Sequence, residues 1–174
     1  MDNKETEYTK DSYLAFRLGG EIFAVSVHKV LEILELQVIT KVPHTPQYMR
    51  GVINMRGEVI PVVDTRIKFN MSVSDDTVRT VIIVLDLFIK NKKVIIGAVA
   101  DSVKEVLEIT EAQIKDAPEI GSNYNTEFIK GMIKSSDDKF IMLLDIDAVF
   151  ASEDIELIRD ISDINIVNTQ VNNL

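Results

Sequence analysis

The side chains in this 174-residue chain that could carry out acid–base chemistry are mainly carboxylates, and they suit helix capping better than catalysis. Asp145 and Asp147 lie two residues apart in the segment LLDID, and Asp64 ends the similar segment VVD. Asp64 and Asp145 each follow an expected strand and precede an expected short helix, where a carboxylate accepts hydrogen bonds from free backbone N–H groups. Asp147 would lie in the first turn of such a helix, where the dipole favours negative charge. Capping is therefore the preferred interpretation.

Metal binding and nucleophilic catalysis find no support in the sequence. The chain has no cysteine, and its two histidines, His28 and His44, are separated by a breaker-rich loop. Neither HxxxH nor DxDxDG spacing occurs, and no G-x-S-x-G, Walker or GxGxxG motif is present. We therefore expect a binding module that is not an enzyme, with no catalytic residue, no cofactor and no metal.

Arg56 is the most conspicuous remaining candidate, because it interrupts the apolar segment RGVINMRGEVIPVVD. The pattern predicts a hairpin with strands at Gly51–Asn54 and Glu58–Val63, and Gly57 supplies the backbone freedom that its turn needs. An exposed turn tolerates any long polar side chain. A rigid hairpin also presents a guanidinium well to a partner's carboxylate. The local residues leave both interpretations open.

Composition narrows the class of partner. The chain carries 19 Lys and Arg against 28 Asp and Glu, a net charge of −9, and 46% of its residues are hydrophobic. Such an acidic globular chain is repelled by nucleic acid and by anionic lipid unless a basic patch compensates. No apolar segment reaches the roughly 18–20 residues that span a bilayer. We expect a cytoplasmic protein that binds neither nucleic acid nor membrane directly.

Short apolar segments separated by turn residues predict a mainly β fold. Tyr13–Leu18 should form a strand that turns at Gly19–Gly20 into the next strand. His28–Leu34 fits either a helical turn or a third strand. Pro61 lacks an N–H group, so its strand should lie at a sheet edge or be bulged there. Val81–Leu85 is uniformly apolar, as in a strand covered on both faces.

The domain organisation expected from these elements is a single folded unit between two polar ends. Residues 1–12 are expected to be a flexible tail, residues 13–161 one domain made of two intertwined β-subdomains, and residues 162–174 a polar tail. Short helices should connect some strands, and one C-terminal helix should begin after Ser152.

An internal repeat determines this architecture. The offset between similar positions grows from 73 residues to 81 along the chain. The clearest matches pair Val30 with Val103, Glu32 with Glu105, Ile33 with Val106, Gly51 with Gly131, and Asp64 with Asp145. Two similar barrels or sheets of roughly five strands each, fused through a common core, explain the repeat.

The repeat also bears on Arg56. Where the first copy has Met–Arg–Gly, the second copy, KGMIKSSDDKFIMLLD, has Ser–Ser–Asp–Asp. It keeps the strand, the glycine and the capping aspartate. The fold therefore does not require the arginine, which favours a role for Arg56 in partner binding.

Several segments together resemble the CheW family of bacterial chemotaxis coupling proteins. They include GGEIFAVSVHKVLEI, VPHTPQYMRGVINMRGEVIPVVDTRIKF, VIIGAVADSVKEVLEIT and FIKGMIKSSDDKFIMLLDID, and the block G-V-I-N-M-R-G-x-x-x-P-V-V-D is the most specific. The resemblance implies two SH3-like five-stranded β-barrel subdomains around a shared hydrophobic core. It also implies a non-enzymatic scaffold, recruited to membrane receptor arrays, that joins the cytoplasmic helical tips of methyl-accepting chemotaxis receptors to the regulatory domain of the histidine kinase CheA.

The resemblance also assigns partner-binding roles to individual positions. Val30, Glu32 and Arg56 match positions that couple receptor or kinase, and Ile33 and Gly57 are their neighbours in the same segments. Further matching positions are Thr80, Val81, Gly97 and Val106. A structural explanation stays open for three of these, because Thr80 and Val81 begin a buried strand and Gly97 could serve backbone geometry alone.

Four other interpretations remain open. Two are adaptors of the same fold from another sensory pathway: a CheV-like protein, or a detached regulatory domain of the kinase. A carboxylate-dependent hydrolase would need carboxylates that converge in a pocket. A barrel that binds a small ligand would need an unfilled interior.

Overall fold

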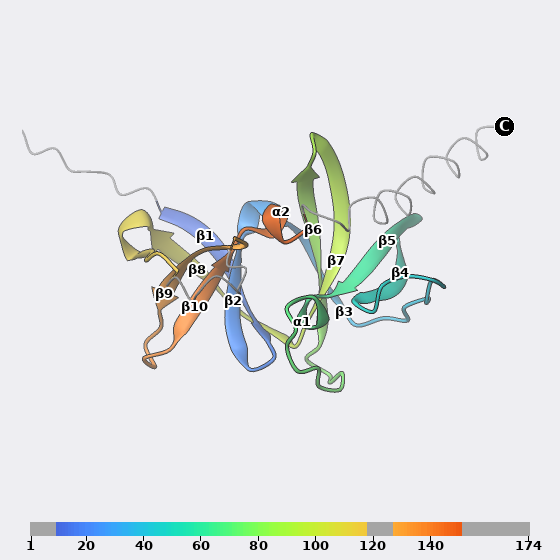
Figure 1. The fold of residues 1–174 in the computed structure, drawn as a ribbon, viewed down its shortest axis with the longest axis horizontal. Coiled ribbons are helices and arrows are strands. Elements are labelled where there is room, and N and C mark those ends of the chain that lie inside the picture. The colour runs from blue at the N-terminus through green and yellow to red at the C-terminus, as the bar shows by residue number, and fades with distance from the viewer. Residues whose placement is uncertain (1–9, 118–126, 151–174) are drawn as a thin grey trace, which may run out of the picture.

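The computed structural model describes residues 10–117 and 127–150. These residues form ten strands, two short α-helices and two 3-10 helices (Figure 1). The strands are β1 (Lys10–Leu18), β2 (Glu21–Ser26), β3 (Val30–Glu35), β4 (Met49–Met55), β5 (Glu58–Asp64), β6 (Val81–Ile89), β7 (Lys92–Ala100), β8 (Ser102–Thr110), β9 (Ile129–Lys134) and β10 (Phe140–Leu144). The helices are η1 (Val27–Lys29), α1 (Thr65–Lys68), η2 (Glu111–Gln113) and α2 (Ile146–Val149).

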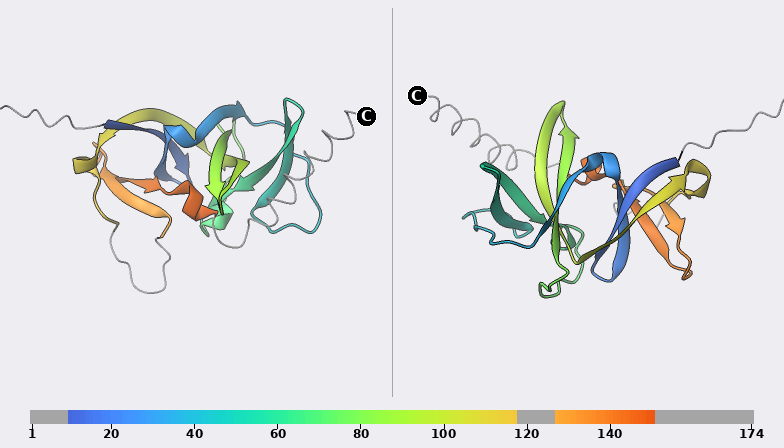
Figure 2. Two further views of the ribbon diagram at one scale, coloured as in Figure 1. Left: turned by 90° about the horizontal axis from the view of Figure 1, so that it is seen from above. Right: turned by 180° about the vertical axis from the view of Figure 1, so that it is seen from behind.

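The strands form two five-stranded sheets, and each sheet combines strands from both repeats. The orders are β8-β1-β2-β10-β9 and β3-β6-β7-β5-β4. The hairpin β1–β2 therefore joins the last three strands of the chain, while the hairpin β6–β7 joins β3, β4 and β5. The two sheets lie side by side, at the left and right of Figure 1, and Figure 2 shows the same separation from behind. The predicted intertwining thus takes the form of a strand exchange between the repeats.

Each sheet closes into a barrel through one isolated bridge. Thr40, in the segment after β3, exchanges backbone hydrogen bonds of 2.9 and 2.8 Å with Val52 of β4. Lys115, beyond β8, exchanges bonds of 2.9 and 2.7 Å with Met132 of β9. We call the sheet that contains β1, together with α2, barrel A, and the sheet that contains β6, together with α1, barrel B. The predicted pair of five-stranded barrels is confirmed.

The two barrels carry bulges at equivalent positions, as an internal repeat requires. The pairing of β3 with β6 skips Leu31, and the pairing of β8 with β1 skips Lys104. Likewise the β4–β5 pairing skips Arg50, and the β9–β10 pairing skips Lys130. A bulge bends a strand and increases its twist. The shared bulges therefore help each five-stranded sheet to curl until its bridge forms.

Gly51 and Gly131 permit the two bridges. Gly51 has φ = 141°, and a Cβ atom on it would lie 2.1 Å from the carbonyl oxygen of Thr40. A Cβ atom on Gly131 would lie 2.4 Å from Cγ2 of Ile114 and 2.9 Å from the carbonyl oxygen of Lys115. Real Cβ atoms do not approach other atoms this closely, so only glycine lets the crossing segment pass.

The main hydrophobic core lies between the barrels and draws on both. It contains Phe16 and Val25 from barrel A together with Ile83 and Ile96 from barrel B, all at most 6% exposed. A cavity lined by residues of both barrels measures only about 10 Å³. Because this is roughly the space of one water molecule, the cavity does not support the small-ligand barrel.

Four aromatic rings extend this core across the junction. The rings of Phe16, Phe23, Phe69 and Phe128 stack in sequence, with centroid separations of 6.3, 5.9 and 4.8 Å. Phe69 follows α1 of barrel B, and the other three belong to barrel A. The stack therefore joins the two barrels and supports one continuous core.

The predicted helix caps are confirmed. The carboxylate of Asp64 accepts a hydrogen bond from the backbone N–H of Arg66 at 3.1 Å, and that of Asp145 accepts one from Ala148 at 3.2 Å. Asp64 is only 2% exposed and is ion-paired. Both carboxylates are thus engaged in structural contacts, which disfavours the hydrolase.

Several local expectations need revision. β5 lies between β4 and β7, so Pro61 is not on an edge strand, and the shift in the β4–β5 pairing lies elsewhere. The ladder from β5 to β7 begins only at Val62, so the missing N–H group of Pro61 costs no bond there. Residues 10–12, expected in the tail, belong to β1 because they pair with β8. His28–Leu34 contains both alternatives, η1 and then β3. The expected C-terminal helix lies outside the described residues.

Candidate functional site

Arg56 lies at the tip of the β4–β5 hairpin, in a turn whose geometry is unfavourable for an arginine. Arg56 and Gly57 have φ values of 52° and 88°, as in a type I′ turn, where Asn and Gly are preferred. Another side chain in this left-handed region costs about 1–2 kcal/mol. The side chain of Asn54 accepts the N–H of Gly57 at 2.9 Å and fixes the turn. The hairpin thus presents a guanidinium at a cost in backbone energy.

Arg56 forms an ion pair with another predicted site residue, Glu32. Its Nη2 atom donates to Oε1 of Glu32 at 3.0 Å, and the two side chains are 76% and 30% exposed. β3 and β4 stand at opposite edges of their sheet, so barrel closure is what brings these residues together. An exposed pair contributes at most about 1 kcal/mol to stability. It does orient both charges on the surface.

Two large apolar residues of β3, next to Glu32 in the sequence, are exposed. Leu31 and Ile33 are 49% and 43% exposed, while Val30 is half-buried against the shared core. Sequence reasoning missed Leu31, although its equivalent in the repeat, Lys104, is a charged residue that indicates an exposed position. We call Val30, Leu31, Glu32, Ile33, Arg56 and Gly57 the β3 surface.

The other four predicted residues lie outside the β3 surface, although Val81 pairs with Glu35 at the end of β3. Thr80 is 4% exposed, and its hydroxyl accepts the N–H of Thr77 at 2.8 Å. Val81 is half-buried at the start of β6. A Cβ atom on Gly97 would lie 2.7 Å from Cγ2 of Ile82, so this glycine is needed for packing. Val106 is 58% exposed but belongs to β8 of barrel A. The structure brings five of the nine predicted residues together.

An open depression continues the β3 surface beyond the end of β3. Its volume is about 720 Å³, and it is lined by Glu35, Leu36, Asp76, Thr77, Val78 and Thr80. Val78 is fully exposed. Thr80 therefore reaches a surface feature as well as closing a turn. Either contribution would account for the partner-binding role predicted for Thr80, which stays a prediction.

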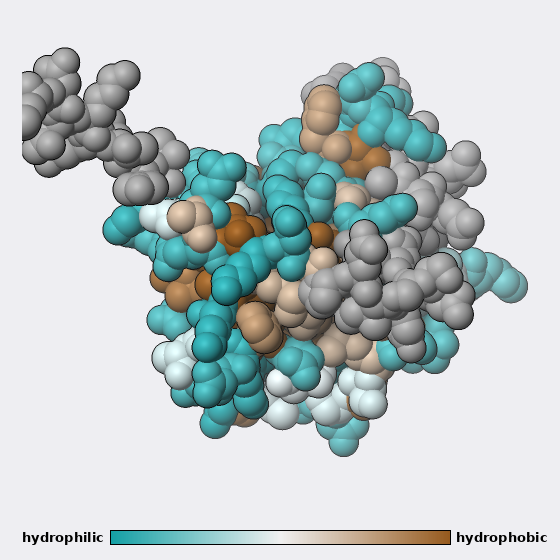
Figure 3. Space-filling model, turned by 60° about the vertical axis from the view of Figure 1, so that its left-hand side comes forward, coloured by the Kyte–Doolittle hydropathy of each residue, from teal (hydrophilic) through white to brown (hydrophobic). Residues whose placement is uncertain are grey.

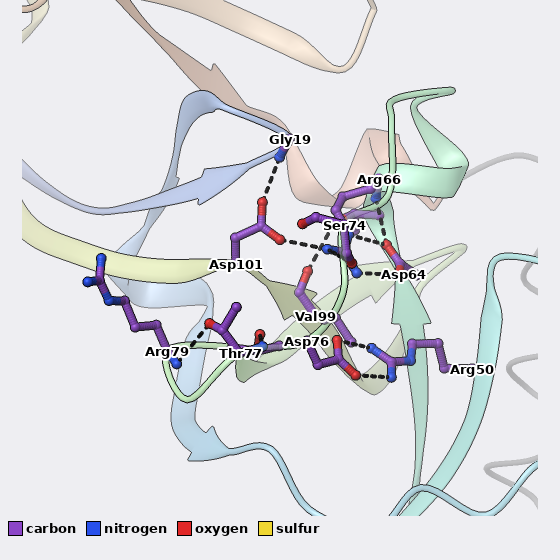
Figure 4. A network of polar contacts seen from close by, with 12 residues as sticks. Gly19, Arg50, Asp64, Arg66, Ser74, Asp76, Thr77, Arg79, Val99 and Asp101 are labelled. Carbon is purple, nitrogen blue, oxygen red and sulfur yellow. Dashed lines mark hydrogen bonds and ion pairs between the residues drawn. The ribbon is translucent and has the colours of Figure 1, made fainter.

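A buried charge network, absent from the predicted residues, joins the two barrels (Figure 4). Arg66 is 1% exposed and makes two hydrogen bonds with the carboxylate of Asp64, at 3.0 and 2.8 Å. It also donates to Asp101 at 2.6 Å, and Asp101 in turn accepts the N–H of Gly19 at 2.7 Å. The hydrogen bond to Asp64 is the main cause that raises the pKa of Arg66. Gly19 lies in the β1–β2 turn of barrel A, so the network connects it to α1 of barrel B.

The opposite side of the junction has a similar contact with its charges reversed. Asp147 of α2 pairs with Lys29 of η1 at 2.6 Å and accepts the N–H of Phe88 at 3.0 Å. In both networks a helix residue pairs with a residue of a crossover segment. The carboxylate of the pair accepts a backbone N–H from the hairpin of the barrel that does not contain the helix. We call these networks the Arg66 clasp and the Asp147 clasp.

Arg50 and Asp76 fasten the loop that precedes β6. Their two hydrogen bonds measure 3.1 and 2.7 Å, and both side chains are about one-third exposed or less. The hydrogen bond from Arg50 lowers the pKa of Asp76 below its ordinary value of 3.8.

This pair predicts a pH-dependent contribution to stability. Because the folded-state pKa of Asp76 is depressed, the pair stabilises the fold above the unfolded-state pKa and is lost as pH falls through the lower, folded value. We expect Asp76→Asn to lower the free energy of unfolding by no more than about 1 kcal/mol near neutral pH. Chemical denaturation from about pH 6 to about pH 3 should show this difference shrinking. A difference that is constant across that range would contradict the assignment.

Apolar side chains reach the surface among charged ones on the face shown in Figure 3, which suits a protein that binds other proteins.

Among residues 10–117 and 127–150, no group of three or more His, Asp or Glu side chains could hold a metal ion. No helix in this part of the chain is long and apolar enough to cross a membrane.

Comparisons with known proteins agree with this architecture. The model of the CheW-like domain family matches residues 12–154. The chain is 36% identical to the chemotaxis protein CheW of Rhizobium meliloti over 82% of its own length and 89% of that protein. It is 33% identical to that of Klebsiella aerogenes over 90% and 91%. The crystal structure of the scaffolding protein TtCheW from Thermoanaerobacter tengcongensis matches with a TM-score of 0.70 and 30% identity, covering 82% of this chain and 93% of that one. The chain therefore belongs to the CheW-like family of chemotaxis coupling adaptors.

Proposed function

We propose that this protein is a non-enzymatic adaptor that couples the cytoplasmic helical tips of chemoreceptors to the regulatory domain of the histidine kinase CheA, and that it is recruited to membrane receptor arrays in this way. The observation that carries the proposal is the β3 surface. There β3 carries the Glu32–Arg56 ion pair and, at the neighbouring positions along the strand, the exposed side chains of Leu31 and Ile33.

The chemistry of this surface suits a helical partner. Exposed apolar side chains such as Leu31 and Ile33 can pack against the apolar face of a helix. Charged groups at the rim, here Glu32 and Arg56, set the register and accelerate encounter. The surface lies on a paired strand and a fixed type I′ turn, so little conformational entropy is lost on binding. A scaffold that must hold two partners in one geometry benefits from this rigidity.

The strained conformation of Arg56 gives a test that separates binding from folding. We expect Arg56→Asn to keep or raise the melting temperature, because Asn suits φ = 52° better than Arg does. The same variant should bind receptor fragment or CheA at least about tenfold more weakly, a loss of about 1.4 kcal/mol. Calorimetry and co-sedimentation with receptor fragment and CheA, with kinase activity as readout, measure both effects.

A charge exchange provides the control. Glu32→Arg combined with Arg56→Glu preserves the ion pair on the surface but reverses the pattern that a partner meets. If the pair served only to order the barrel, the double variant would regain full binding, and our proposal would fail. We expect it to remain as weak as Arg56→Asn. A large fall in melting temperature for Arg56→Asn would also contradict the proposal.

A further inference from the structure

Barrel A has a pocket at the position that corresponds to the Arg56 turn of barrel B. It measures about 50 Å³ and opens between the β1–β2 turn, the β8 bulge and the β9–β10 turn. Its lining residues are Arg17, Gly20, Glu21, Ile22, Lys104, Ser135, Asp137, Lys139 and Phe140. This space is enough for roughly three or four water molecules, or for one carboxylate group. We call it the basic pocket.

Three cations line the basic pocket, and none of them is held in an ion pair within the part of the chain that the structure describes. The side chains of Arg17, Lys104 and Lys139 are all exposed. Glu21 and Asp137 also line the pocket, yet within residues 10–117 and 127–150 none of the three cations forms an ion pair with a carboxylate. The lining therefore carries one net positive charge, three cations against two carboxylates, on a chain whose net charge is −9. An incoming anion would be attracted to this local positive charge.

The fold places these cations at defined points. The β8 bulge displaces Lys104 from the ladder, as the β3 bulge displaces Leu31 in barrel B. Lys139 closes the β9–β10 turn, where its carbonyl oxygen accepts the N–H of Ser135 at 2.7 Å. The adjacent Phe140 is 45% exposed. The two barrels thus differ at the same position. Barrel B carries exposed apolar side chains and one ion pair there, whereas barrel A carries three cations and one exposed aromatic ring.

We infer that the basic pocket is a second protein-docking surface, and that its partner is an acidic segment which places carboxylates beside Arg17, Lys104 and Lys139 and an apolar side chain against Phe140. Charge complementarity selects this partner, because three unpaired cations favour clustered carboxylates and reject basic segments. The half-exposed ring adds an apolar contact that a free ion would not use. Binding here is independent of the β3 surface, which lies on the other barrel.

The test uses the full-length protein and an acetylated, amidated Glu-Glu-Phe-Glu-Glu peptide as the probe. In ¹H–¹⁵N spectra we expect the peptide to shift the amide signals of residues that line the basic pocket. The affinity should fall as salt is raised, because the charges are exposed. Replacing the three cations by glutamine should weaken binding on the order of tenfold, since each exposed charge contributes roughly two- to threefold.

A matched variant controls for net charge. Lys90, Lys92 and Lys93 at the β6–β7 turn are also exposed, and their replacement by glutamine changes the net charge by the same amount. That variant and Arg56→Asn should both bind the peptide as the wild type does. The inference is overturned if the turn variant loses as much affinity, if a Lys-Lys-Phe-Lys-Lys peptide binds equally well, or if inorganic phosphate gives the same shifts at the same concentration.

Discussion

Replacing Arg66 with methionine should lower the free energy of unfolding by about 3–5 kcal/mol, because it leaves a buried carboxylate without its partner. Asp64 is 2% exposed and receives two side-chain hydrogen bonds from Arg66. Asp101 would lose its contact with the helix as well. Because the Arg66 clasp spans both barrels, the loss should appear in one cooperative transition. Urea denaturation, followed by circular dichroism, measures the change.

Two further variants show whether the effect comes from the clasp. Arg56→Met makes the same change of side chain at an exposed position, and we expect it to leave stability within about 0.5 kcal/mol of wild type. Asp64→Asn keeps the helix cap but removes the buried charge. Combined with Arg66→Met it should therefore cost less than the sum of the two single changes. Additive losses would show that Arg66 contributes through packing alone.

Gly51→Ala should cost about 2–5 kcal/mol, because the new Cβ atom would lie 2.1 Å from the carbonyl oxygen of Thr40. Two costs combine at this position. The backbone has φ = 141°, which an L-residue rarely adopts, and the nearest atom belongs to the backbone and cannot rotate away. The bridge between Thr40 and Val52 must then open, and barrel B loses its closure. The fall in stability is measured by the same denaturation experiment.

Gly20→Ala is the matched control for that experiment. Gly20 also has a positive φ, 87°, but a Cβ atom there would meet nothing within 4 Å. It should therefore show the backbone cost alone, about 1–2 kcal/mol. If the two variants were equally stable, the close approach of Thr40 to Gly51 would have no energetic consequence, and barrel closure would need another explanation.

The sequence was most informative where the signal was local. The caps at Asp64 and Asp145 were predictable because a short polar side chain just before a helix commonly accepts a hydrogen bond from a free backbone N–H group. The hairpin around Arg56 was predictable because alternating apolar residues surround a glycine-containing turn. The repeat then supplied the two barrels, since similar segments adopt similar structures.

Contacts between distant segments were not predictable from the same patterns. In the sequence, Arg66 looks like a solvent-exposed residue of a short helix. Only the folded structure brings it into contact with Asp101 and buries it against Asp64. Glu32 and Arg56 were each singled out, but their contact depends on closure of barrel B. The repeat likewise shows which segments are alike without showing which hairpin pairs with which strands. Pro61 was misplaced for this reason, because strand order is a property of the whole sheet.

The exchange of hairpins between the repeats has a consequence for how such a chain can change over generations. Barrel B is encoded by one continuous stretch, from β3 to β7, whereas barrel A needs both ends of the folded region. A deletion or recombination event at the repeat boundary therefore removes part of both barrels and delivers neither one whole. Exchange of one whole repeat alters both barrels at once, whereas substitution in place can alter one surface alone. Leu31 and Lys104 illustrate such a substitution. They occupy equivalent bulges in the two barrels, and one is apolar while the other is charged.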